Sequence, residues 1–167
     1  MGTVIVQVRN LTNISSEVLN FLLKAIFQKT LAEANRQGIR LIVLNRRDFP
    51  GSTSLSEDDL APIKPAEADA SKLIAFLHER ALEIIGFIHA VIKELTLPVQ
   101  IAQGGAISIL GWSLGSMYCF AIIDAFMAPD LPIKTKEMVK ECISSVILFG
   151  WSQNYCFTSL SNWSCSD

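Results

Sequence analysis

The apolar residues of this chain fall into short continuous runs that alternate with longer amphipathic stretches. The short runs are typical of buried strands and occupy residues 4–8, 40–45, 106–110 and 144–149. The amphipathic stretches have helical spacing and occupy residues 17–37, 66–95, 113–127 and 135–141. This alternation predicts the α/β class: a mostly parallel sheet of about four strands flanked by helices.

Two segments show neither periodicity. Residues 46–65 contain Pro50, Gly51 and Pro62 among Ser and Asp residues, which predicts a long surface loop. Residues 150–167 are dominated by Trp, Ser, Asn, Cys and Thr, and we expect an irregular tail there. Because 167 residues are one domain's worth, we expect a single domain over 1–149, followed by that tail.

Composition excludes several classes of function. The net charge is −2 and the basic residues are scattered, so we expect no nucleic-acid partner. No apolar stretch approaches the roughly 20 residues of a membrane span. The first residues lack a signal-peptide pattern, so a cytoplasmic location is expected. The 4 cysteines form no CxxC pair and have no zinc-type His spacing, so we expect reduced thiols, no metal and no cofactor.

The chemistry-bearing motif is Gly111-Trp112-Ser113-Leu114-Gly115, between a predicted strand and a predicted helix. This Gly-x-Ser-x-Gly pattern is the nucleophile elbow, in which glycines avoid clashes that a Cβ would cause and leave the serine hydroxyl exposed. Ser113 is the predicted nucleophile, and the backbone N–H of Leu114, at the helix N-terminus, is a predicted donor to the oxyanion. Trp112 either lines an acyl pocket or packs in the core.

A second segment is informative together with the elbow. It occupies residues 40–52 and reads Arg-Leu-Ile-Val-Leu-Asn-Arg-Arg-Asp-Phe-Pro-Gly-Ser. Together the two segments resemble the α/β-hydrolase fold family, in particular its small fungal-type members. Most members end this strand in Asp-x-x-Gly-x-Gly-x-Ser; here Asn45 replaces the Asp, Asp48 and Pro50 replace the glycines, and Ser52 matches. The resemblance covers residues 27–149 and implies the N-terminal half of a serine hydrolase. It therefore implies that the doubly wound sheet, and the domain over 1–149, are partial.

The remaining catalytic groups of such an enzyme are missing. Its triad acid and histidine would follow the serine, yet no histidine follows Ser113. His78 and His89 lie in a predicted outer helix before the elbow, with no acid three or four residues away to orient them. Residues 1–26 contain no histidine, so the His-Gly motif that precedes the second oxyanion donor is absent too. The acids after the elbow are Asp124, Asp130, Glu137, Glu141 and Asp167.

Two functions therefore stay open. The first is a serine hydrolase in which Ser113 attacks an ester or related acyl bond of a small-molecule substrate. An acyltransferase on the same fold is a related possibility, and it would lack the same catalytic histidine. The second is a catalytically inactive, truncated hydrolase or half-domain, which self-associates through an uncovered sheet edge at residues 144–149. On either alternative we interpret the chain as an incomplete hydrolase, either a truncated product or a gene model that reads through non-coding sequence.

Overall fold

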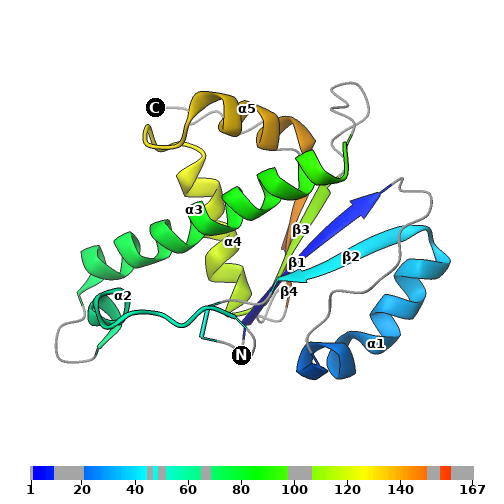
Figure 1. Cartoon of the computed structure of the whole chain (residues 1–167), viewed down its shortest axis with the longest axis horizontal. Coiled ribbons are helices and arrows are strands. Elements are labelled where there is room, and N and C mark those ends of the chain that lie inside the picture. Colours follow the sequence, from blue (N-terminus) through cyan, green and yellow to red (C-terminus); the bar gives the residue numbers. More distant parts are fainter. Residues whose placement is uncertain are drawn as a thin grey trace.

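The computed structural model describes residues 2–9, 21–44, 47–48, 52–64, 69–97, 107–149 and 155–158, with the backbone alone for 2–9, 21–27 and 155–158. It is an α/β structure in which helices flank one sheet (Figure 1). The elements, in chain order, are β1 (Gly2–Arg9), α1 (Phe21–Arg36), β2 (Ile39–Leu44), α2 (Glu57–Leu60), the 3-10 turn η1 (Ala61–Ile63), α3 (Ala70–Glu94), β3 (Ile107–Ser113), α4 (Gly115–Ala125), α5 (Ile133–Cys142), β4 (Ile143–Phe149) and β5 (Tyr155–Thr158).

The sheet has the strand order β2-β1-β3-β4-β5 and is mixed. Only β3 and β4 pair in parallel; β1 runs antiparallel to both β2 and β3, and β5 runs antiparallel to β4. The expectation of a mostly parallel sheet of about four strands is therefore wrong. A buried apolar run has the same pattern whichever way the strand points, so the sequence carried no signal for the direction of β1.

The directions of the strands nevertheless bring three carboxyl ends together. Because β1 is antiparallel to both of its neighbours, β2 points the same way as β3 and β4. Leu44, Ser113 and Phe149 therefore end their strands at one edge of the sheet. The carboxyl ends of strands are where open α/β sheets place their ligands, so this edge is the first place to look for a site.

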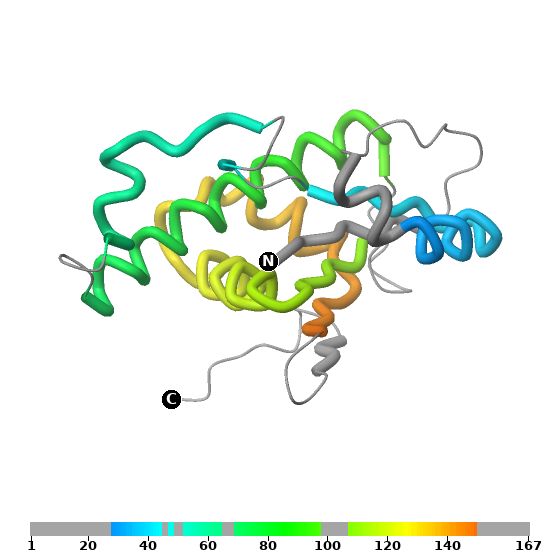
Figure 2. Tube along the Cα trace, turned by 90° about the horizontal axis from the view of Figure 1, so that it is seen from below, coloured from blue at the N-terminus to red at the C-terminus, as the bar shows by residue number. Residues whose placement is uncertain are grey.

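Helices cover both faces of the sheet. Helices α3 and α4 lie side by side on one face, with α4 against β1, β3 and β4 (Figures 1 and 2). Ile42 and Leu44 of β2 pack toward this side, whereas Ile39 and Leu41 of the same strand line a hollow against α1. Since alternate residues of a strand face opposite ways, α1 lies on the other face.

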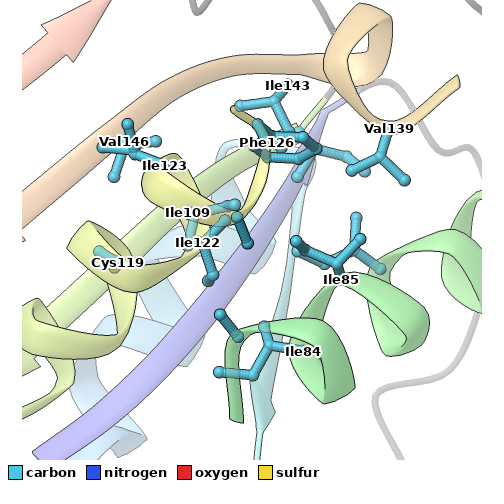
Figure 3. Packing of buried hydrophobic residues seen from close by; sticks show 14 of the residues in the cluster. Ile84, Ile85, Ile109, Cys119, Ile122, Ile123, Phe126, Val139, Ile143 and Val146 are labelled. Atoms are coloured by element: carbon cyan, nitrogen blue, oxygen red, sulfur yellow. The ribbon is translucent and has the colours of Figure 1, made fainter. Parts of the chain in front are cut away.

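The core lies between α3, α4, α5 and the sheet. In β3 the alternate residues Ile107 and Ile109 are 0% exposed, as are Ile85 in α3 and Ile122 in α4. Figure 3 shows Ile85 on the side of α3 that faces Ile122 and Val139. Burying each such side chain stabilises the fold by about 1.5–3 kcal/mol, so this layer fixes β3 and α4 relative to each other.

The helix boundaries follow local capping chemistry. Asp69 accepts a hydrogen bond from the backbone N–H of Lys72 and begins α3, later than the predicted start at residue 66. The predicted surface loop over 46–65 is wrong in part, because it contains α2 and η1. Ser56 and Asp59 form a reciprocal capping box there, which satisfies backbone donors that a helix start leaves unpaired.

The tail also differs from expectation. Residues 155–158 form β5, so the tail is not wholly irregular, and β4 is not the uncovered edge that the sequence predicted. Only residues 150–154 separate β4 from β5, too few for the crossover that a parallel neighbour would need. Among the described strands, the edges of the sheet are β2 and β5.

Candidate active site

The predicted elbow joins β3 to α4. Gly111, Trp112 and Ser113 end the strand, Leu114 caps the helix and Gly115 is its first residue, so the expected strand–turn–helix context is confirmed. Ser113 has a φ of 55°, in the left-handed region that a side chain with a Cβ rarely adopts. Such a residue costs about 1–3 kcal/mol, and residues of this kind cluster at active sites.

Close packing explains why the elbow has a glycine before the serine. A Cβ on Gly111 would lie 2.6 Å from the carbonyl oxygen of Gly115 and 2.7 Å from Sγ of Cys119. The buried hydroxyl of Ser116 donates to the carbonyl oxygen of Gly111 at 3.1 Å, which ties the strand end to the first turn of α4. The elbow is therefore held by contacts on both sides of Ser113.

The groups around Ser113 are partly open to solvent. Ser113 and Trp112 are half-buried, and the side chain of Leu114 is 48% exposed. The N-terminus of α4 has no side-chain cap, so its first backbone N–H groups are not bonded by the capping residue. The backbone N–H of Leu114 lies at this end, where the helix dipole favours negative charge. Its role as an oxyanion donor remains a prediction.

His78 lies away from the elbow. Both His78 and His89 are in α3, and Nε2 of His78 is 2.7 Å from Oδ2 of Asp130, which follows the far end of α4. The 11 residues of α4 span about 16 Å, so this pair is well separated from Ser113. The hydrogen bond from His78 lowers the pKa of Asp130. No sequence signal connected these two residues, because 52 positions separate them.

A second group of polar residues lies near the elbow edge and was not predicted. Arg47 is 3.1 Å from both Asp59 and Glu83, and Arg80 is 3.3 Å from Asp59 and 3.2 Å from Glu83. Hydrogen bonds from the backbone and hydroxyl of Ser56, helped by the two arginines, lower the pKa of Asp59 to about 2. The Ser56-x-x-Asp59 spacing and the i,i+3 pair Arg80–Glu83 were the signals available in the sequence.

This ion-pair group borders a hollow among the described residues. It has a volume of about 220 Å³ and lies beside Leu44 and Tyr118, at the edge that carries Ser113. A larger hollow, about 450 Å³, lies between α1 and the beginning of β2, at the opposite end of that strand. Position therefore favours the smaller one as part of a site.

The segment that carries the second half of the resemblance has a specific conformation. Asp48 has a φ of 66°, and its Oδ1 accepts a hydrogen bond from the backbone N–H of Leu55 at 2.7 Å. Asp is among the few residues other than glycine that tolerate this conformation, which explains how it stands where the family pattern has a glycine.

Cysteine, metal-ligand clusters and long apolar helices were the remaining features of interest in the described part of the chain. Burial raises the pKa of the Cys119 thiol to about 12, so its thiolate is suppressed at neutral pH. Among the described residues, no three His, Cys, Asp or Glu side chains gather in a way that could hold a metal ion. No helix within the described ranges is long and apolar enough to cross a membrane.

Comparisons with protein-family models, with curated proteins and with solved structures gave no match. The resemblance to α/β-hydrolases thus rests on the two sequence segments of this chain, and any activity drawn from it is a proposal.

Proposed function

We propose that this chain is a serine acyl hydrolase of the α/β-hydrolase type, with Ser113 as the nucleophile toward a carboxylic ester or a related acyl bond. The observation that carries this proposal is the φ of 55° at Ser113, on a sharp turn between a strand and a helix. That backbone is the conformation the nucleophile elbow requires.

In the proposed first step Oγ of Ser113 forms a bond to the substrate carbonyl carbon, and the bond from that carbon to the alcohol oxygen breaks. The alkoxide takes up a proton from solvent, and an acyl-serine remains. In a second step water hydrolyses the acyl-serine to the acid and restores Ser113. The Ser113 proton passes to solvent, because His78 is bonded to Asp130 at the other end of α4. The backbone N–H of Leu114 supports the oxyanion. Lack of a triad member typically leaves about 10³- to 10⁴-fold acceleration over water, so acylation is expected to be slow.

This mechanism predicts one acylation followed by much slower hydrolysis of the acyl-serine, because His78 is bonded to Asp130 and does not activate the attacking water. With excess p-nitrophenyl acetate, we expect slow release of nitrophenolate that reaches about one equivalent per chain, and an acetyl group on Ser113 detected by peptide mass spectrometry. Ser113→Ala should abolish the acetylation, whereas Ser54→Ala, which alters an exposed serine outside the elbow motif, should leave it unchanged. Acetylation at other serines with none at Ser113 would disprove the proposal.

The separation of Ser113 from the His78–Asp130 pair favours a second candidate: a non-catalytic half-domain that associates through a sheet edge. Among the described strands, the edges available for this association are β2 and β5. This candidate predicts no acetylation together with a concentration-dependent molar mass in light scattering. A folded monomer that acetylates at Ser113 would eliminate it.

A further inference from the structure

The hollow beside the elbow edge has apolar walls and one charged side. Its apolar lining comes from four different parts of the chain and consists of Leu44, Leu55, Phe76, Ile84, Phe87 and Tyr118. Its charged lining consists of Arg47, Arg80 and Glu83. A concave, mainly apolar surface with a few converging polar groups is the usual form of a small-molecule site.

The register of the sheet places this hollow close to Ser113. Leu44 ends β2 and pairs with Val4, and Val4 pairs in turn with Gly111. Two strand spacings separate Leu44 from Gly111, about 10 Å. Tyr118, five residues after Ser113 in the sequence, contributes from α4, yet Ser113 itself does not line the hollow.

The charged side of the hollow is already balanced. The two positive charges of Arg47 and Arg80 face the two negative charges of Asp59 and Glu83 at distances of 3.1–3.3 Å. The guanidinium of Arg80 also lies over the ring of Phe76, 5.3 Å from its centre, which fixes the arginine against the aromatic wall. An added carboxylate would therefore meet no net positive charge in this network, although Nε of Arg47 and Nε of Arg80 are buried without a hydrogen-bond partner among the described residues.

Exposure shows which part of this network borders solvent. The side chain of Glu83 is 43% exposed and that of Arg47 is 26% exposed, whereas Arg80 is only 11% exposed. The apolar wall residues Ile84 and Tyr118 are 6% and 9% exposed. The ion pairs thus form the outer side, and the apolar surface lies behind them.

We propose that this hollow, lined by Phe76, Phe87 and Tyr118 behind the Arg47–Glu83 pair, binds a small neutral molecule with an aromatic or aliphatic body. Its apolar walls favour such a body, and the balanced ion pairs disfavour an ionised ligand, whose charge would be desolvated without a partner. An apolar cavity of about 150 Å³ holds benzene, so 220 Å³ admits a ring with a small substituent. The proposal does not depend on the reactivity of Ser113.

The test compares acetophenone with benzoate, which have nearly the same shape and differ in charge. Neither is an ester, so hydrolysis does not interfere. With the full chain at neutral pH, ligand-observed NMR titration should give a dissociation constant for acetophenone at least about tenfold lower than that for benzoate. Equal affinities for the two compounds, or no binding of acetophenone, would overturn the proposal.

Two pairs of variants locate the binding. Leu55→Trp fills the hollow and should weaken acetophenone binding, whereas Leu73→Trp, on an exposed part of α3 outside the lining, should not. Glu83→Gln leaves the network with one excess positive charge and should strengthen benzoate binding, unlike Glu79→Gln, one turn earlier on α3. An unchanged acetophenone affinity in Leu55→Trp would place the ligand elsewhere. Acetylation of Ser113 without acetophenone binding would overturn this inference and leave the proposed function intact.

Discussion

At Ser113 the backbone adopts a conformation that costs about 1–3 kcal/mol for a residue with a side chain, and the surrounding contacts enforce it. Gly111 lies against the first turn of α4, and the hydroxyl of Ser116 bonds to its carbonyl oxygen. These two contacts leave the chain little freedom to relax at Ser113. The strained backbone conformation of Ser113 is therefore maintained by the packing of the whole elbow.

A substitution at Gly111 tests this packing. In Gly111→Ala the new Cβ would meet the carbonyl oxygen of Gly115 at 2.6 Å, and backbone cannot give way as a flexible side chain can. We expect the free energy of unfolding in urea to fall by about 1–3 kcal/mol, the usual cost of overpacking.

The matched control is Gly86→Ala in α3, where an added Cβ would meet nothing within 4 Å. Removing a helix-interior glycine should raise the free energy of unfolding by up to about 1 kcal/mol. Equal changes in the free energy of unfolding for the two variants would contradict the claim that β3 and α4 pack closely at Gly111.

At the scale of elements, the segment before α3 is ordered by Asp59. Its carboxylate caps α2 through Ser56 and pairs with Arg47 and Arg80, which come from two other parts of the chain. The short helix α2 is thereby tied to α3. The two arginine Nε atoms are buried without a hydrogen-bond partner among the described residues, so part of this gain is offset by desolvation.

The lowered pKa of Asp59 predicts a pH dependence of stability. Its pKa falls from 3.8 to about 2 on folding, so its ionised form stabilises the native state. This contribution is fully present above pH 3.8 and is lost as the pH falls through about 2. Asp59→Asn should therefore be less stable than the wild type at pH 7, and the difference should shrink over that window.

Asp58→Asn provides the control, because Asp58 is an exposed neighbour in the same short helix. Chemical denaturation at several pH values measures both variants. A stability difference for Asp59→Asn that persists unchanged below pH 2 would show that its carboxylate charge is not the stabilising feature.

At the scale of the whole molecule, the apolar patterns of the sequence predicted individual helices and strands. They did not predict how the strands pair in the sheet. The run before Ser113 and the helical spacing after it predicted β3 and α4, because core packing imposes those patterns. The antiparallel direction of β1 and the addition of β5 depend on long-range pairing that apolar runs do not encode. Likewise, Ser113 was identifiable from its motif, whereas the group of Arg47, Asp59 and Glu83 arises only when distant segments meet.

The measurement that tests the central claim most directly is labelling of the folded chain with a fluorophosphonate probe, with the modified residue mapped by mass spectrometry. The account predicts a single label on Ser113, lost in Ser113→Ala and retained in Ser54→Ala. A folded sample that takes up no label, or takes it up at a residue other than Ser113, would contradict the account and leave the elbow as a structural feature alone.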